Sequence, residues 1–278
     1  MVLYIGGIRA TSSNSSSGGK KYVINREVSA QGVYQMPKSD FTFSLPSGAT
    51  DVGDYALYSA FYNCSYLVGA LNLSSLISAS GRQAMDNAFY NCTGLTSVDL
   101  SNLVIVGHNS GGTSSSVLGG AFSRCTGLTG ALNLSSLTTV NSYSAMSTTF
   151  SYCTGLTSVD LSSLTTITGG RIGMSGTFQG CTKLTSVDLS SLAVVNGEQA
   201  MQSIFSGCTS LTSLSFPSLT STSFGSYTNQ FNNMLQGVTG CTVHFPSNLQ
   251  SKIGSWSDVT AGFGGTNTTV LFDLTATS

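Results

Sequence analysis

The sequence predicts a solenoid, an α+β repeat of about seven stacked coils that each contain a short helix-like turn and a short strand. Three observations predict this fold. Cysteines recur about every 27 to 33 residues, a period typical of repeat architectures. An apolar i, i+4, i+7 pattern leads up to each cysteine, and a short apolar–polar alternation follows it. A single unit of this kind cannot bury its apolar side alone, so stacked units are expected to share one continuous core.

The helix-like turn comes first in each unit. Its apolar positions lie four and three residues apart, which places them on one face of a helix. Unit by unit they are Leu57, Phe61 and Cys64; Met85, Phe89 and Cys92; Leu118, Phe122 and Cys125; Met146, Phe150 and Cys153; Met174, Phe178 and Cys181; Met201, Phe205 and Cys208; Met234, Val238 and Cys241. We expect the cysteines to lie in one buried line as free thiols, which pack as small hydrophobic side chains. A metal site or a series of disulfides is the alternative.

A short strand follows each cysteine, as at Val98, Asp99 and Leu100, where apolar, polar and apolar residues alternate. Such alternation is typical of a strand with one buried side. Stacked units are therefore expected to form a parallel sheet along one face. The first and third units carry one more residue here, with Gly69 and Gly130 placed where a β-bulge would absorb it.

The N-terminal part differs from the repeats. Residues 2–8 suit a strand, residues 11–20 (TSSNSSSGGK) have the composition of a flexible linker, and residues 41–45 suit a first, incomplete coil that caps the stack. We divide the chain here into an attachment arm, residues 1–36, and a solenoid with its N-terminal cap, residues 37–241.

The C-terminal part, residues 242–278, is predicted to cap the other end, because an open solenoid end exposes its core. Residues 248–256 suit a short helix, Thr269–Leu274 a final strand, and Trp256 a part of the lid. Two insertions, at residues 107–117 and 221–230, lengthen corners between units.

The repeat residues resemble the leucine-rich-repeat family, whose L-x-x-L-x-L frame recurs as Leu95-x-x-Val98-x-Leu100. The phrase A-F-x-x-C-x-x-L, present as Ala88, Phe89, Cys92 and Leu95, is similar to the BspA-type bacterial class. The resemblance covers residues 54–249, although these units are longer than that class usually has. It implies a secreted surface adhesin. Residues 1–10, however, lack the basic start and continuous apolar run of a secretory signal, so we expect no signal peptide there.

Composition and motifs narrow the function classes. Charged residues make up 8% of the chain and the net charge is −1, which gives no electrostatic attraction to nucleic acid or to an anionic membrane. No apolar run is long enough for membrane insertion. The histidines, His108 and His244, lie in no recognisable catalytic or metal-binding motif. We expect neither an enzyme nor a cofactor.

A column of polar residues is the candidate binding site. These residues stand between the inward strand positions, so they should line up on the solvent side of the sheet, the concave face that leucine-rich-repeat families commonly use for binding. They are Asn72, Asp99, Asn133, Asp160, Asp188, Ser215 and His244. Flanking serines and threonines widen the face at Thr96, Ser97, Thr157, Ser158, Thr185 and Ser186. The expected ligand is a host cell-surface glycan or a protein loop, with a cation between carboxylates less favoured. The alternative is a solvated position that simply tolerates Asp and Asn.

Two functions follow from these features. The opening VLYIGG at residues 2–7 resembles the start of bacteriophage tail proteins. It suggests a virion tail or fibre protein whose arm binds other virion proteins and whose solenoid contacts the host. The alternative is a BspA-like adhesin or protein–protein interaction module on the bacterial surface or secreted, and a third, weaker one is an intracellular scaffold. A homo-oligomer is compatible with each role.

Overall fold

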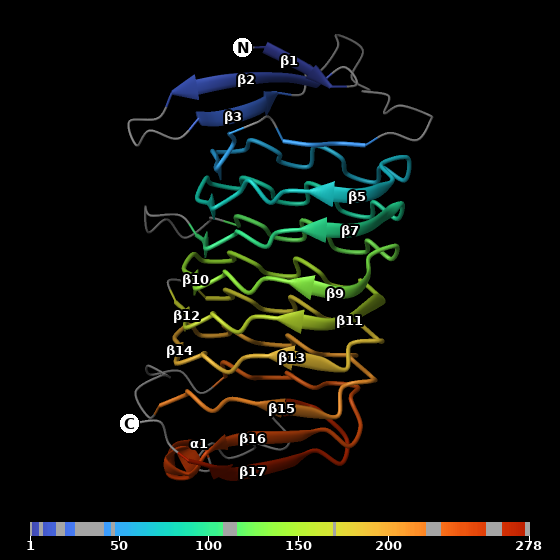
Figure 1. Cartoon of the computed structure of the whole chain (residues 1–278). Coiled ribbons are helices and arrows are strands. Elements are labelled where there is room, and N and C mark those ends of the chain that lie inside the picture. The colour runs from blue at the N-terminus through green and yellow to red at the C-terminus, as the bar shows by residue number, and fades with distance from the viewer. Residues whose placement is uncertain are drawn as a thin grey trace.

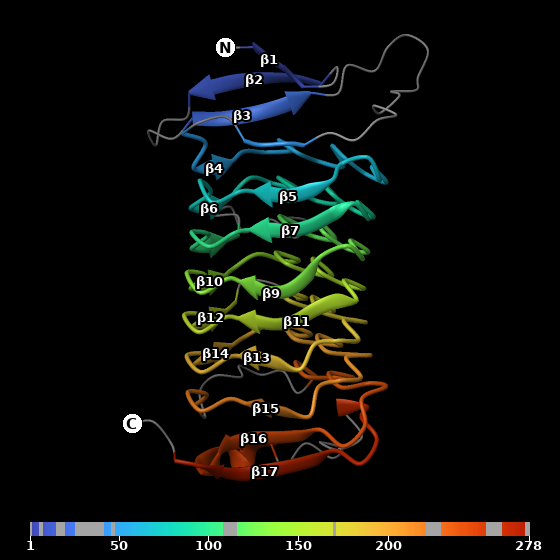
Figure 2. The same cartoon turned by 45° about the vertical axis from the view of Figure 1, so that its right-hand side comes forward.

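The computed structural model describes residues 2–5, 8–14, 20–25, 42–45, 48–107, 116–168, 171–220, 229–253 and 263–275, and the side chains among them from residue 42 to 251 and from 263 onward. It is a straight column of stacked coils with the two ends of the chain at opposite ends (Figures 1 and 2). The predicted solenoid is confirmed. The corner insertions lie largely outside the described residues, and Trp256 and His108 lie wholly outside them.

One side of the column carries the predicted parallel strands. They are β5 (Gly69–Asn72), β7 (Leu95–Asp99), β9 (Thr129–Asn133), β11 (Gly155–Asp160), β13 (Ser186–Asp188), β15 (Ser213–Ser215), β16 (Thr242–Pro246) and β17 (Thr269–Leu274). They form three successive sheets along this strand face, in the orders β5-β7, β13-β11-β9 and β15-β16-β17. The register shifts beside Gly69 and opposite Gly130, whose φ angles are 84° and 78°. The irregularities lie where they were predicted, but the residue that the pairing passes over is Thr96 of β7 or Thr157 of β11, on the neighbouring strand and not on the strand of the glycine.

A second parallel sheet runs down the adjacent side, and the sequence analysis missed it. Its strands have two residues each: β4 (Asp51–Val52), β6 (Ser78–Ala79), β8 (Ile105–Val106), β10 (Thr139–Val140), β12 (Thr166–Ile167) and β14 (Val194–Val195). All six pair in one sheet (Figure 2). The second residue of each strand is buried, from Val52 to Val195. One apolar residue per unit was the only signal, too little to predict a strand.

The third side of the column consists of consecutive turns. The prediction of a helix-like turn is therefore wrong about the backbone conformation of this side. Along these turns, one backbone amide donates a hydrogen bond within its own coil and the next amide donates to the following coil. The Ala60 N–H donates to the Leu57 carbonyl (3.0 Å), and the Phe61 N–H donates to the Ala88 carbonyl of the next coil (2.7 Å). Every fourth residue has a positive φ, as at Ser59 (49°) and Asn63 (60°). An α-helix is about 10 Å wide, whereas strands stack about 4.8 Å apart. A helix in every coil would therefore not fit this stack.

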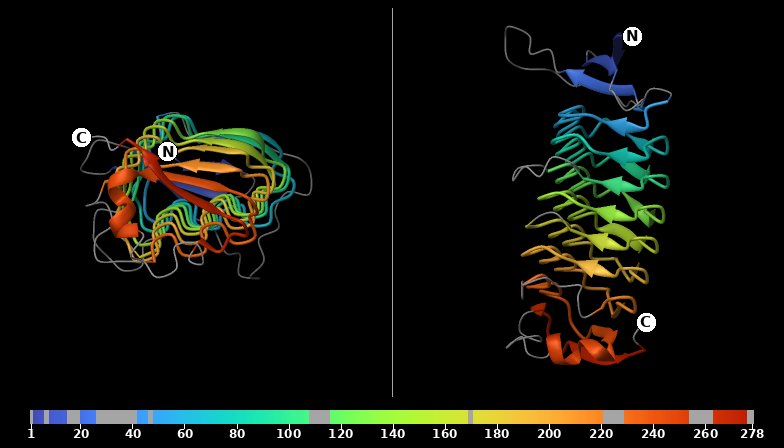
Figure 3. Two further views of the ribbon diagram at one scale, coloured as in Figure 1. Left: turned by 90° about the horizontal axis from the view of Figure 1, so that it is seen from below. Right: turned by 90° about the vertical axis from the view of Figure 1, so that its left-hand side faces the viewer.

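The same argument explains why the column is straight. A leucine-rich repeat curves when its helical side is wider than its strand side. Here the buried phenylalanine rings on the turn side are spaced by 5.2 to 6.1 Å, close to the strand spacing. Seen along the axis the coils nearly superimpose, and seen from the side they stack without a bend (Figure 3). The strand face is straight rather than concave, which corrects the expectation.

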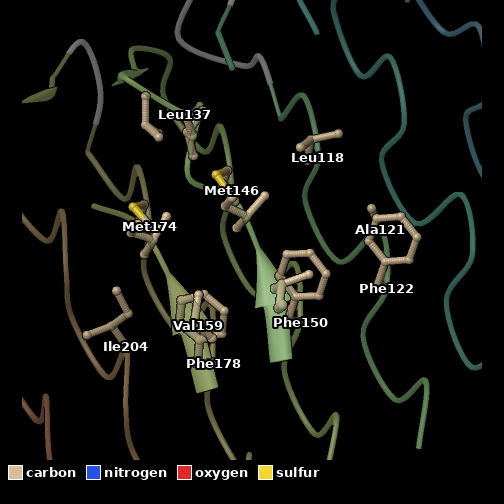
Figure 4. Packing of buried hydrophobic residues seen from close by; sticks show 14 of the residues in the cluster. Leu118, Ala121, Phe122, Leu137, Met146, Phe150, Val159, Met174, Phe178 and Ile204 are labelled. Atoms are coloured by element: carbon tan, nitrogen blue, oxygen red, sulfur yellow. The ribbon is translucent and has the colours of Figure 1, made fainter. Parts of the chain in front are cut away.

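The core is a set of ladders, one side chain per coil. Phe61, Phe89, Phe122, Phe150, Phe178 and Phe205 are fully buried and stack with interplanar angles of 6° to 8°. Figure 4 shows Phe122, Phe150 and Phe178 in line beside Met146 and Met174. All seven cysteines are buried and free, as predicted.

The seventh unit departs from the predicted frame. The Phe205 N–H donates to the Met234 carbonyl, which places Leu235 in the phenylalanine ladder and Val238 in the cysteine column. Cys241 then occupies the position that leucine holds in the other units, so the seven cysteines do not form one line. Phe231, Leu235 and Val238 have the same i, i+4, i+7 spacing as the frame ending at Cys241, and all are buried. Spacing alone could not separate the two frames.

The N-terminal strands form a small antiparallel sheet of β1 (Val2–Ile5), β2 (Ile8–Asn14) and β3 (Lys20–Asn25). The linker prediction is wrong for residues 11–14 and for Lys20, because these residues pair in β2 and β3; residues 15–19 lie outside the described part. The predicted incomplete coil is confirmed. Phe43 is buried with its ring centroid 4.7 Å from that of Phe61, and Ser44 bridges to Asn72.

The C-terminal end is closed by aromatic side chains. Phe216, Phe231, Phe245, Phe263 and Phe272 pack ring against ring there. The predicted helix is a short 3-10 turn, η1 (Ser247–Leu249), followed by α1 (Gln250–Ile253), and the predicted final strand is β17. No helix within the described ranges has the length and apolar character needed to cross a membrane.

Candidate ligand-binding face

The polar column lies on the strand face in equivalent positions. Asn72 pairs with Asp99, Asn133 with Asp160 and Asp160 with Asp188, while Ser215 pairs with His244. Five of these side chains are exposed, and Asp160 and His244 are half-buried. The structure therefore brings the predicted residues together, but in three separate ladders because the strands form three sheets.

The Asn and Asp side chains also shape the chain. In each, Oδ1 accepts a hydrogen bond from the backbone N–H two residues later, at 2.9 to 3.0 Å. The pairs are Asn72 with Ser74, Asp99 with Ser101, Asn133 with Ser135, Asp160 with Ser162, and Asp188 with Ser190. This Asx turn holds the corner after each strand. This role was not predicted, although the Leu-Ser that follows every Asn and Asp of the column was its signal. In each aspartate the corner bond uses only Oδ1 and leaves Oδ2 as an acceptor for a ligand.

A groove of about 620 Å³ lies over the middle of this face. It is lined by Ala131, Leu132, Asn133, Ser158, Val159, Asp160, Ser186, Val187, Asp188, Leu189, Ser190, Ser215 and Pro217. Four of the predicted site residues line it, together with the flanking Ser158 and Ser186. Ala131, Ser190 and Pro217 were not predicted, because nothing in one unit indicates how far a groove extends along the stack.

The other predicted residues lie outside this groove. Asn72 and Asp99 belong to the β5-β7 sheet of the first two coils. The Nδ1 atom of His244 lies 3.0 Å from both carboxylate oxygens of Asp273 on β17. That pair joins the last two strands of the solenoid, so His244 belongs to the C-terminal cap rather than to the groove.

The described side chains of the groove present hydroxyl, amide and carboxylate groups. Within those parts of the chain, no group of three His, Cys, Asp or Glu residues could hold a metal ion. The cysteine thiols face the core: the Cys92, Cys125 and Cys153 Sγ atoms donate to phenylalanine carbonyls of the preceding coil at 3.0 to 3.1 Å. Burial raises the pKa of Cys125 and of Cys181 to about 12, which keeps these thiols protonated and unreactive.

Stacked coils with a parallel strand face and an Asx corner define a leucine-rich-repeat solenoid. Its sequence matches the BspA type leucine rich repeat region in six copies, over residues 38–170 and 85–236. These stretches together span more than half of the chain, so the protein belongs to the BspA-type leucine-rich-repeat family. Repeats of this family are typically non-enzymatic.

Several solved structures match the chain at low identity. A leucine rich cell surface protein from Faecalibacterium prausnitzii A2-165 is 13% identical, with a TM-score of 0.30 over 97% of this chain and 94% of that chain. A leucine-rich repeat protein from Bacteroides ovatus ATCC 8483 is 15% identical, with a TM-score of 0.23 over 94% and 98%. The pneumococcal vaccine antigen PcpA is 10% identical, with a TM-score of 0.25 over 98% of each chain. No curated protein sequence matches the chain.

Proposed function

We propose that this protein is a non-enzymatic binding protein of the bacterial surface, displayed or secreted, that holds its partner in the strand-face groove. The observation that carries the proposal is the groove of about 620 Å³, in which Asn133, Asp160, Asp188 and Ser215 project from consecutive coils. Membership of a family whose proteins are typically surface adhesins supports the same role.

The construction of the groove favours binding. Each lining strand is hydrogen-bonded within the stack, and the corner bonds restrain the side chains of Asn133, Asp160 and Asp188. A partner therefore meets side chains that are already ordered, which lowers the entropic cost of binding. Because hydroxyl and amide groups dominate the surface, the affinity should depend only weakly on salt.

The virion role, which the sequence analysis put first, becomes the alternative. It depends on the resemblance at residues 2–7, and neither the family match nor the similar structures support it. In that role β1 to β3 would attach the solenoid to other virion proteins. Immunogold labelling of intact producing cells and of purified particles separates the two roles, because label on the cells alone favours the bacterial surface.

The proposed function is tested with the full chain, measured by flow cytometry on intact epithelial and bacterial cells. The double variant Asp160→Lys and Asp188→Lys has long cationic side chains in the groove and should not bind the cells. Thr139→Lys with Thr166→Lys, on the β4–β14 sheet, is the matched control and should bind normally. Equal binding by both double variants would rule out the groove as the contact surface.

A further inference from the structure

The groove has two rows of outward side chains. Asn133, Asp160, Asp188 and Ser215 form one row, and Ala131, Ser158 and Ser186 form the other. Residues two positions apart on a strand point to the same side, about 6.6 Å apart. Between the rows lie Leu132 and Val159, whose side chains are buried in the core. The trough between the rows therefore crosses the strands and runs along the solenoid axis.

The trough is periodic along this axis. Neighbouring strands lie about 4.8 Å apart, and the pairings of Asn133 with Asp160 and of Asp160 with Asp188 repeat one Asx side chain per coil. The second row repeats a small side chain at the same steps, since Ala131 pairs with Ser158 and Ser158 with Ser186. A ligand whose own units advance by one strand spacing can make the same contacts at every coil.

Two kinds of extended polymer can be compared with this period. An extended peptide advances about 3.3 Å per residue and presents side chains to one side about every 6.6 Å, so it falls out of step with the coils. In a chain of pyranose sugars linked equatorially through opposite ring positions, the advance per sugar is close to one strand spacing, and successive rings are turned over, so each ring edge recurs at every second coil. The period of the trough thus matches a linear glycan and not a peptide.

The side chains select among glycans. Carboxylate oxygens of Asp160 and Asp188 accept hydrogen bonds from sugar hydroxyls, and the hydroxyls of Ser158 and Ser186 both donate and accept. The lining residues include two carboxylates and no Lys or Arg. An anionic glycan would be repelled, because like charges brought together without a counter-charge raise the energy of the complex.

We propose that the groove binds an uncharged linear glycan lying along the solenoid axis, with one sugar ring per coil across β9, β11 and β13, the lining strands that pair in one sheet. This inference rests on the proposed function and specifies the partner of the same site. The Asx row contacts one edge of the glycan and the serine row contacts the other. The corner bonds hold the Asx row in place before the glycan arrives.

The test uses the full chain, titrated calorimetrically with cello-oligosaccharides of two to six sugars, whose rings carry the vicinal diols that periodate cleaves. Affinity should rise with each sugar up to three, the number of lining strands that pair in register, and then level off, because β15 begins a separate sheet. An uncharged peptide of equal length should bind at least tenfold more weakly. Affinity that does not depend on sugar number, or a preference for the peptide, would overturn the proposal.

Equivalent positions in other repeats supply the test variant and its matched control. Ser158→Ala with Ser186→Ala reproduces the alanine that the third coil has at residue 131, and should lower glycan affinity roughly tenfold through lost hydrogen bonds. Ser97→Ala makes the same change in the second coil, which pairs with Ala70 and lies outside the lining residues, and should leave affinity unchanged. Equal losses in both would show that the serine row has no specific role.

Treatment of the cells separates this inference from the proposed function. Periodate, which cleaves sugar diols, should abolish binding of the full chain, whereas trypsin should leave it. The reverse result, with binding still lost in Asp160→Lys with Asp188→Lys, would replace the glycan by a protein partner and keep the groove. If no oligosaccharide binds and periodate has no effect, the glycan inference is overturned.

Discussion

Replacing Phe150 with alanine removes a central ring of the buried ladder. Phe150 is fully buried and stacks on Phe122 at 5.3 Å and on Phe178 at 5.9 Å between ring centroids. Emptying a large core site of this kind costs about 3–5 kcal/mol. Each aromatic pair adds about 0.5–1.5 kcal/mol beyond the buried area, and this substitution breaks two pairs. We therefore expect a loss near the upper end of the core range, measured by urea unfolding.

The location of the damage is the sharper part of this prediction. Coils contact only their neighbours, so stability is approximately a sum of local terms. Native-state hydrogen exchange of Phe150→Ala should show faster exchange first in the coils of Phe122, Phe150 and Phe178. Tyr62→Ala is the control, because Tyr62 stacks on Tyr90 at 4.7 Å but is 42% exposed, and it should cost little. Uniform loosening of all coils would refute the additive description.

Three further predictions concern the thiols, a glycine and the Asx corner. A thiol reagent should react slowly with the native protein, and after denaturation it should react with seven thiols. Burial raises the native pKa of Cys241 from 9.0 to about 11 and that of Cys125 to about 12, and it raises the pKa of the other thiols as well. Unfolding therefore releases protons above pH 9, so stability should fall as the pH rises from 9 to 12. Loss of native stability only below pH 9 would contradict this. Gly180→Ala should cost about 1–3 kcal/mol in thermal unfolding, since Gly180 has a φ of 73° and an added Cβ would lie 2.5 Å from a Tyr152 ring carbon. Gly240→Ala, with a φ of 72° and open space, isolates the backbone strain and should cost less; an equal cost would remove the steric part of the argument. Asp160→Asn should keep the corner bond and the melting temperature, whereas Asp160→Ala should lose about 1 kcal/mol, and equal stability of the two would show that the corner bond contributes nothing.

The strand face could be predicted because its signal is local. Val159 and Leu161 alternate with Asp160 in one unit, and the same alternation recurs in the next, so the direction of the side chains and their stacking follow from one unit. The column of site residues followed in the same way. The positions of the register shifts at Gly69 and Gly130 were also predictable, since one additional residue must be absorbed where the backbone can take a positive φ. Which strand carries the unpaired residue was not, because that depends on the neighbouring coil.

The turn face could not be predicted from the apolar pattern. An i, i+4, i+7 spacing such as Leu57, Phe61 and Cys64 fits both a helix and a run of turns, and the choice depends on the distance to the next coil. Asn63 and Asn91, with φ of 60° and 56°, carried the missing signal, because asparagine tolerates positive φ better than most residues. The displacement of Cys241 and the limits of the groove likewise depend on contacts between coils.

Carbodiimide labelling of carboxylates, read by mass spectrometry on the full chain with and without saturating cell-surface partner, tests the central claim most directly. The account predicts that the partner protects Asp160 and Asp188, which line the groove. Labelling of Asp99 should not change, since it holds the equivalent strand position outside the groove. Unchanged labelling of Asp160 and Asp188 while the partner is bound would contradict the strand-face groove as the binding site.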